Sequence, residues 1–201
     1  METSKQKNKA FLKLDLLGDL FESTEALSAG LNRNALKRLT DTGKLERLGE
    51  GVYKKVESTF DLALEDFAVA CIKLGPDSYI TGPSALSFHN LINFTPKTLW
   101  IAATENKRSK NYRVIRCTKE PNMEGVLVVE KFVRIAGVER AIVDAFYLST
   151  KISLQHAFYA AHSAFESNIT TPAKVLELAR KIGLENVILK HWEAINLDKF
   201  Q

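Results

Sequence analysis

The stretch from Phe21 to Tyr53 constrains the fold of this chain more than any other part of its sequence. Its pattern predicts a short helix, a tight turn, a second helix and a small β-hairpin. Ser23 or Thr24 is suited to cap the first helix, because a short polar side chain accepts a hydrogen bond from a free backbone N–H group. We expect Gly30 to adopt the left-handed conformation that ends this helix, and Asn32 to cap the second one.

The second helix is expected to end at Gly43 and to have one apolar and one polar side. A period of about 3.6 residues per turn groups its apolar residues on one side: Ala35, Leu36 and Leu39. The opposite side carries basic and amide side chains: Arg33, Asn34, Lys37 and Arg38. Arg and Lys suit guanine edges and phosphates, and Asn suits adenine, so this pattern predicts the recognition helix of a helix-turn-helix. The alternative is a helical hairpin whose charged side is simply solvated.

The hairpin that follows has glycines on both sides of Glu50 at its tip, and we interpret it as the wing of a winged helix. Basic residues at its base and along its strands would flank the DNA groove. The predicted DNA-binding set therefore joins the second helix to the wing: Asn32, Arg33, Asn34, Lys37, Arg38, Lys44, Arg47 and Lys54.

Several motifs between about Leu20 and Leu197 resemble the AbiEi family, the antitoxin halves of type IV (AbiE-type) toxin–antitoxin systems. The N-terminal motifs are residues 24–30, 36–39, 43–53 and 62–67, and the C-terminal motifs are residues 82–89, 100–102 and 138–146. One position departs from the family pattern, because family members usually carry a basic residue between the wing glycines, where this chain has Glu50.

The resemblance to this family implies binding partners that cannot be deduced from the residues alone. An AbiEi antitoxin binds double-stranded DNA at inverted repeats in its own promoter, here expected as a monomer or weak dimer, and represses its operon. It also counters a nucleotidyltransferase-like toxin encoded nearby, usually without forming a stable complex with it. A winged-helix regulator that has no toxin partner is the alternative, and a module that binds only proteins is a third possibility.

The chain of 201 residues predicts an α/β (α+β) protein. We expect a disordered tail over residues 1–9 and a winged helix-turn-helix DNA-binding domain over residues 10–58, which begins with a helix over residues 10–20. A C-terminal α+β antitoxin domain over residues 59–201 is expected to hold a small mixed sheet and several helices. Strands are expected near residues 78–81, 98–103, 112–117, 126–130 and 131–135, with antiparallel pairings favoured by the short connections. Helices are expected over residues 62–74, from 82, and over 138–148, 153–165, 172–182 and 185–197.

The formal net charge of +4 is mildly basic and permits nucleic-acid binding without requiring it. Part of this charge lies in a second basic run, and its members are Lys107, Arg108, Lys110, Arg113 and Arg116. The run is interpreted either as a solvated loop and strand face or as an additional surface for DNA or an acidic partner.

The sequence predicts no metal site and no cofactor. Cys71 and Cys117 are the only cysteines and are expected to stay reduced, and the four histidines lack ligand spacing relative to either of them. No apolar run is long enough to span a bilayer, so no membrane association is expected and the protein is predicted to be cytoplasmic.

The enzyme alternative with the best pattern is a metal-dependent nuclease that uses Asp77, Glu105 and Lys107. For nucleophilic catalysis, Ser84 and His89 would act with Asp144 as the orienting residue. However, Ser84 and His89 lie on one helix at a spacing that points them to different sides, and no nucleophile elbow precedes them. We therefore predict no catalytic residue and a protein that is not an enzyme.

Overall fold

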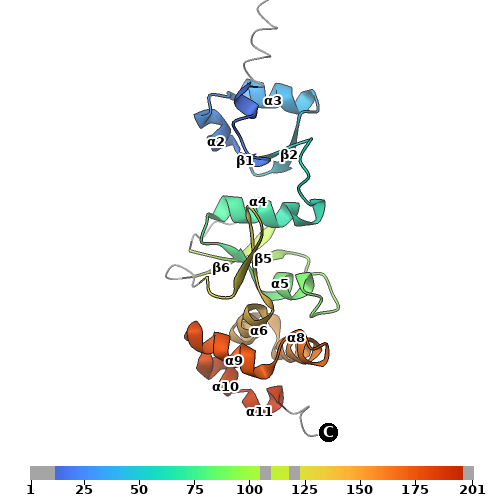
Figure 1. The fold of residues 1–201 in the computed structure, drawn as a ribbon, viewed down its shortest axis with the longest axis vertical. Helices are drawn as coiled ribbons and strands as arrows, with labels where there is room; N and C mark the ends of the chain where they lie inside the picture. Colours follow the sequence, from blue (N-terminus) through green and yellow to red (C-terminus); the bar gives the residue numbers. More distant parts are fainter. Residues whose placement is uncertain (1–11, 105–109, 118–122, 197–201) are drawn as a thin grey trace, which may run out of the picture. The chain divides into compact units, whose positions relative to one another are not determined.

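Helices and strands of the described residues form a mixed α+β fold, as the sequence predicts. The computed structural model describes residues 12–104, 110–117 and 123–196 (Figure 1). It divides into two compact units, residues 1–73 and 74–201, which are considered separately below. The boundary expected at residues 58–59 lies inside the first unit, and the tail expected over residues 1–9 lies outside the described residues.

The first unit has the element order of a winged helix. Strand β1 (Leu20–Glu22) is followed by α2 (Ser23–Ser28), α3 (Arg33–Asp41), β2 (Leu45–Gly49) and β3 (Val52–Lys55). Among the described residues these strands form an antiparallel sheet in the order β1-β3-β2. The hairpin β2–β3 therefore lies in one sheet with the strand that precedes the helix-turn-helix.

The helix expected over residues 10–20 is wrong in its second half. Residues 12–14 are helical, but β1 begins at Leu20, which pairs with Lys54 of β3. The backbone N–H of Lys55 also donates to the Asp19 carbonyl at 2.9 Å. Leu16 is 78 % exposed, so the apolar spacing of this segment does not mark one buried helical face. Pairing with β3 overrides the local helical pattern here.

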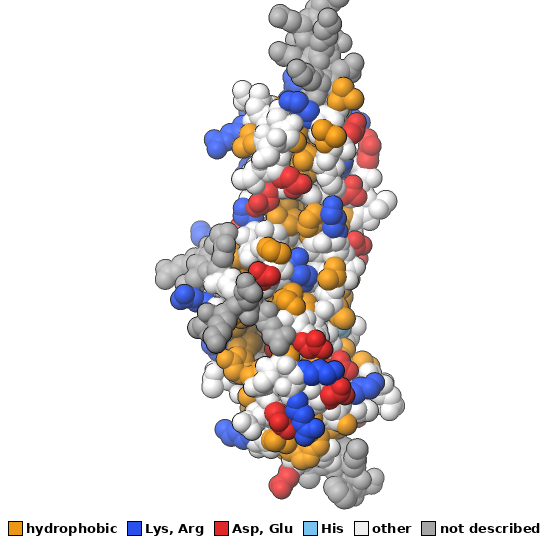
Figure 2. Space-filling view, turned by 60° about the vertical axis from the view of Figure 1, so that its left-hand side comes forward, with side chains coloured by type: hydrophobic (Ala, Val, Ile, Leu, Met, Phe, Trp, Pro, Cys, Tyr) orange, Lys and Arg blue, Asp and Glu red, His pale blue; other side chains and the backbone are white. Residues whose placement is uncertain are grey.

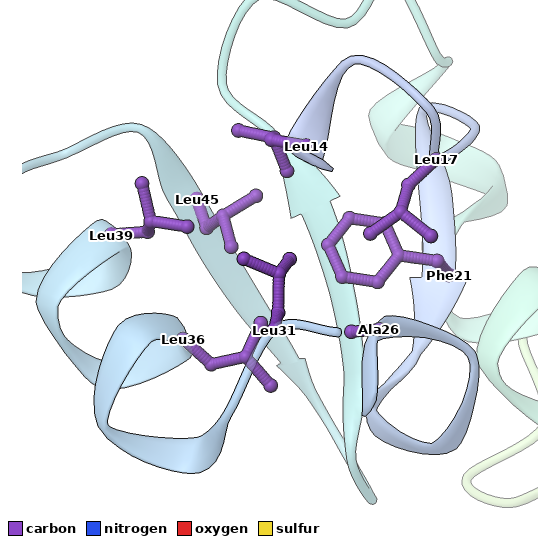
Figure 3. Packing of buried hydrophobic residues seen from close by; sticks show 8 residues of the cluster. All are labelled: Leu14, Leu17, Phe21, Ala26, Leu31, Leu36, Leu39 and Leu45. Carbon is purple, nitrogen blue, oxygen red and sulfur yellow. The ribbon is translucent and has the colours of Figure 1, made fainter. Parts of the chain in front are cut away.

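A single cluster of buried side chains holds α2, α3 and the sheet of the first unit together. Its members come from every element of the unit up to β2 and point toward one another (Figure 3): Leu14, Leu17, Phe21, Ala26, Leu31, Leu36, Leu39 and Leu45. Phe21 also stacks on Tyr53 of β3, with 6.0 Å between ring centroids. Burial of the apolar side of α3 in this cluster determines which side of the helix faces outward.

The predicted caps are partly confirmed. The Asn32 Oδ1 accepts a hydrogen bond from the Ala35 N–H at 2.8 Å, and Gly30 and Gly43 have positive φ beyond the ends of α2 and α3. The cap expected from Ser23 or Thr24 is wrong, because α2 begins at Ser23 itself. The Ser23 N–H instead donates to a backbone carbonyl of the hairpin tip, that of Gly51, at 2.8 Å.

The tip of the hairpin is a tight two-residue turn formed by Glu50 and Gly51. Both residues have positive φ, +49° and +82°, as a type I′ turn requires. This turn matches the right-handed twist of the strands on either side, and the predicted hairpin is confirmed.

Helix α4 (Glu65–Leu74) follows a 3₁₀ turn (Leu62–Leu64) and is joined to the sheet by ion pairs. Lys73 Nζ lies 2.8 Å from Glu22 Oε1. Lys54 is 5 % exposed and pairs with Glu65 of α4 and, at 3.1 Å, with Glu46 of β2. The hydrogen bond to Glu65 raises the pKa of Lys54, despite the opposing effect of burial.

In the second unit the described residues form a five-stranded mixed sheet in the order β6-β5-β4-β8-β7. The strands are β4 (Tyr79–Ile80), β5 (Leu99–Ala103), β6 (Tyr112–Arg116), β7 (Val126–Glu130) and β8 (Val133–Ala136). Pairs β4–β5 and β7–β8 are antiparallel, whereas β5–β6 and β4–β8 are parallel. The mixed sheet is confirmed, but the preference for antiparallel pairing is wrong for these last two pairs. Strands β4 and β8 are far apart in sequence, so no short connection sets their direction. Strands β5 and β6 are parallel although only residues 104–111 separate them.

Helix α6 (Val138–Tyr147) is the central helix of the second unit. It contacts α5 (Gly82–Phe88), α8 (Leu154–Glu166), α9 (Pro172–Lys181) and α10 (Glu185–Leu189), and Figure 1 shows α8 and α9 on its two sides. The short helices α7 (Ser149–Ile152) and α11 (Trp192–Ile195) complete the described set. The helix expected over residues 185–197 is thus interrupted at Lys190 and His191, and residue 197 lies outside the described residues.

A buried polar network connects α6 to β4. Arg140 Nε donates to Asp144 Oδ1 at 2.9 Å, one helical turn away. Thr81 Oγ1 donates to Asp144 Oδ2 at 2.6 Å, and Arg140 Nη2 donates to the Tyr79 hydroxyl at 2.6 Å. Arg140 Nη1 donates to the Glu124 carbonyl at 2.8 Å. No buried side-chain N or O atom among the described residues lacks a partner, so this network is fully satisfied.

We expect Asp144→Ala to lower the free energy of unfolding by about 3–5 kcal/mol, because it leaves the Arg140 charge buried without its counter-charge. Urea denaturation of the full chain measures the change. Glu185→Ala is the matched control, since it removes a carboxylate from a solvent-exposed pair with Arg180 and should cost at most about 1 kcal/mol. Equal losses for the two variants would contradict a structural role of the buried network.

We expect Lys54→Met to lower the free energy of unfolding by about 1–2 kcal/mol at neutral pH. The folded-state pKa of Lys54 lies above its unfolded value, so its stabilising contribution is fully present below the ordinary lysine pKa of 10.5. That contribution is lost as the pH rises through the higher folded-state value. Urea denaturation of both proteins from pH 7 to pH values above 10.5 tests this, and a difference that does not shrink at high pH would assign the effect to packing.

Candidate nucleic-acid interface

The polar side of α3 is an outward-facing surface. Arg33, Asn34 and Lys37 are exposed, and Arg38 is half-buried. Leu36 and Leu39 on the other side are 1 % and 2 % exposed. Because residues three and four apart are neighbours on a helix, the structure brings the basic and amide side chains together.

The charge of this helix favours an anionic partner at its N-terminal end. Its first turn holds no acidic residue, and its one acidic residue, Asp41, is the last of the helix. The free N–H groups and the helix dipole also favour negative charge at this end. The N-terminal residues of a recognition helix are those that contact base edges, and here these are Arg33 and Asn34.

Asn32 has a structural role that limits its use in binding. Its side-chain oxygen caps α3 through the hydrogen bond to Ala35, so a base contact by this exposed residue would use its amide N–H groups. The residue matters for the helix whether or not it contacts DNA.

On the wing, Lys44 and Arg47 are exposed, as the predicted role requires. Lys44 Nζ lies 3.2 Å from Glu57 Oε1, and both side chains are well exposed. Exposed pairs of this kind contribute at most about 1 kcal/mol, so a phosphate competes readily for the lysine.

Lys54 does not lie where the prediction requires. Neighbouring residues of a strand point to opposite faces, and Lys54 points to the face opposite Tyr53, where Glu46 and Glu65 hold its ammonium group. The structure therefore removes Lys54 from the DNA-binding set. One of these two carboxylates, that of Glu65, comes from α4, and the local sequence pattern does not indicate that it reaches Lys54.

Two lysines outside the predicted set support the helix-turn-helix. Lys13 Nζ donates to the carbonyl of Gly30, in the turn between α2 and α3, at 2.6 Å. Lys55 Nζ donates to the Leu17 carbonyl at 2.7 Å. These bonds fix the position of backbone segments beside α3, and nothing in the local sequence pattern indicated them.

The second basic run does not form one surface on the described residues. Arg113 and Arg116 lie on β6 at an odd separation, so they point to opposite faces, and Lys110 is exposed just before the strand. The Arg113 guanidinium lies 4.3 Å from the centroid of the Trp100 ring. Lys107 and Arg108 lie outside the described residues.

The residues weighed for nucleophilic catalysis lie apart in separate structural roles. Ser84 Oγ accepts a hydrogen bond from the Trp100 N–H at 2.9 Å, and His89 Nε2 lies 2.8 Å from the Ala136 carbonyl. Asp144 belongs to the buried network with Arg140. The structure therefore does not arrange them as nucleophile, base and orienting acid.

Of the residues weighed for a nuclease, Asp77 is exposed in the turn before β4, while Glu105 and Lys107 lie outside the described residues. Within the described ranges no group of His, Cys, Asp and Glu side chains is placed to hold a metal ion. Cys71 is buried and Cys117 half-buried, and neither is part of a disulfide. None of the described helices has the length and apolar character needed to cross a bilayer.

Basic and acidic side chains are intermixed on the side of the molecule that Figure 2 shows. The small positive net charge is therefore not spread there as one continuous basic face. A local group of exposed cations is nevertheless present on α3 and at the base of the wing.

Comparison with known proteins identifies a family for the N-terminal segment. Residues 12–53 match the model of a family described as "Transcriptional regulator, AbiEi antitoxin". The matched segment contains α2, α3, β2 and the start of β3. A comparison with curated proteins finds no match. The match confirms, over the helix-turn-helix and the wing, the resemblance to AbiEi antitoxin regulators that the sequence motifs indicated.

Proposed function

We propose that this protein is the antitoxin of a type IV toxin–antitoxin system and represses its own operon by binding double-stranded DNA. The observation that carries the proposal is the outward-facing basic side of α3, within a segment that matches a family of antitoxin regulators. The family description supports a DNA-binding regulator. The operon, the toxin and the cytoplasmic location belong to the proposal.

In the proposed complex α3 enters the major groove. Arg33 and Asn34 read base edges near its N-terminal end, while Lys37 and Arg38 contact bases or phosphates. Lys44 and Arg47 contact phosphates from the wing. Glu50 at the wing tip is repelled by the phosphate backbone, so the tip itself makes no backbone contact.

The expected site on the DNA is a pair of inverted repeats in the gene's own promoter, each bound by a monomer or one half of a weak dimer. Each lysine or arginine that neutralises a phosphate adds about 0.9 to the slope of log affinity against log salt concentration. If the protein is a repressor that binds DNA in this way, its affinity for the DNA must fall steeply as the salt concentration is raised.

The second unit is proposed to act against a partner protein that it does not hold in a stable complex. A nucleotidyltransferase-like toxin encoded nearby would be countered without a stable complex, and this part of the proposal rests on the family resemblance. We assign the protein no catalytic residue and no cofactor.

We expect Arg33→Ala and Arg38→Ala each to weaken binding to a duplex that carries the gene's upstream region by about 1–3 kcal/mol, the worth of a bidentate contact to a base. Fluorescence anisotropy at two salt concentrations, against scrambled DNA, measures the change. Arg180→Ala, an exposed arginine on α9, is the control with the same loss of charge. Unchanged affinity for both α3 variants would remove this helix from the recognition role.

A stand-alone regulator without a toxin is the second candidate. The family match ends at residue 53 and so does not include the second unit, to which we assign the action against a toxin. Expression of the neighbouring gene, with and without this protein, separates the two readings. The antitoxin proposal expects growth arrest that this protein relieves. Relief that survives in Arg33→Ala would show that neutralisation does not depend on DNA binding, whereas the absence of any arrest would favour the stand-alone regulator.

A further inference from the structure

The second unit contains an open pocket that the proposed function does not use. Its volume is about 360 Å³, within the range of roughly 300–1,000 Å³ that is usual for small-molecule sites. Side chains from the loop before β5, from β5 and β6, and from α7 and α8 line it. The lining residues used below are Phe94, Lys97, Trp100, Arg113, Lys151 and His156.

The lining of this pocket is cationic. Lys97, Arg113 and Lys151 are exposed, and none of the described residues that line the pocket is acidic. Cations gathered around one hollow with no lining carboxylate repel one another and favour an anion between them. A phosphate group suits them best, because arginine donates to it through paired N–H groups and lysine adds a compact point charge.

Trp100 forms a rigid floor to the pocket. Trp100 is 8 % exposed in a cluster with Ile115 and Leu148, and its backbone N–H donates to Ser84 Oγ at 2.9 Å. A Cβ atom at Gly82 would lie only 3.2 Å from the indole, so the glycine lets the ring pack closely against the start of α5. The Trp100 ring in turn positions Arg113, whose guanidinium carbon lies 4.3 Å from the ring centroid.

Two aromatic side chains also line the pocket. Phe94 is 38 % exposed, and its ring centroid lies 5.0 Å from that of His156. His156 Nδ1 donates to the Ile152 carbonyl at 3.0 Å, which holds the imidazole in place. An exposed phenyl ring beside a fixed imidazole provides a surface on which a flat heterocycle stacks.

We propose that this pocket binds a nucleoside 5′-phosphate, with the phosphate between Arg113 and the lysines and the base against Phe94. Such a ligand unites a phosphate and a flat ring at a spacing that a pocket of this size accommodates. It is available in two forms, as a free mononucleotide or as a unit of a single-stranded nucleic acid. The site lies within the second unit and is independent of α3.

Trp100 provides a local reporter for the test. Trp100 and Trp192 are the two tryptophans of the chain, so Trp192→Phe leaves a single indole at the floor of the pocket. In this variant of the full chain, adenosine 5′-monophosphate is expected to change the Trp100 emission saturably. Inorganic phosphate and adenosine should bind more weakly, because each supplies half of the contacts.

Arg113→Gln is expected to weaken the affinity for adenosine 5′-monophosphate by about tenfold or more, the loss of a charge-assisted hydrogen bond. Arg116→Gln is the matched control, since it removes the same charge from the same strand on the opposite face, and it should change the affinity by less than about twofold. Calorimetry repeats the comparison, because Arg113→Gln also alters the surroundings of the indole.

A comparison of two ligands shows whether the pocket binds a free mononucleotide or a unit of a single-stranded nucleic acid. A short thymidine oligonucleotide that binds in an Arg113-dependent way, while the mononucleotide does not, identifies a strand as the source. The reverse result identifies a free nucleotide, and both results support the proposal. Equal effects of Arg113→Gln and Arg116→Gln, phosphate binding as tight as that of the nucleotide, or no Arg113-dependent binding at millimolar concentrations would each overturn it.

Discussion

Burial of the apolar side of α3 is the constraint on which the function of the first unit depends. Leu36 and Leu39 pack into a cluster that includes Phe21 of β1 and Leu45 of β2. A helix anchored along one side cannot rotate about its axis without exposing that side, at a cost of roughly 1.5–3 kcal/mol for each large side chain. The same packing that stabilises the unit therefore determines which side chains reach a partner.

The local pattern of the sequence was sufficient to predict the elements of the first unit that depend on neighbours in the chain. Asn32, Gly30 and Gly43 mark helix ends through bonds and dihedral angles that involve only adjacent residues, and their positions are confirmed. The hairpin tip is confirmed for the same reason. The contacts of α3 and the wing with DNA stay predictions, because exposure shows that a side chain is available and not what it binds.

The predictions were wrong where contacts between residues far apart in the sequence determine the local structure. Leu20 joins β1 because β3 offers it a partner, and Lys54 is buried because a carboxylate on α4 reaches it. The parallel pairing of β4 with β8 likewise joins segments that are far apart in the sequence. The pocket above Trp100 has no local signal either, since its lining comes from separate elements.

The conformation of Glu50 has a consequence for how this family can vary. At φ +49° the residue adopts a backbone conformation that is free of strain for glycine but costs most L-residues, Asn and Asp excepted, roughly 1–2 kcal/mol. Glutamate, lysine and arginine bear this cost alike, because none is branched at Cβ, so the turn does not discriminate between a negative and a positive side chain. The fold thus leaves the sign of the charge at the wing tip open to selection. In the proposed DNA complex, a charge reversal at this position would change the affinity while the hairpin keeps its shape.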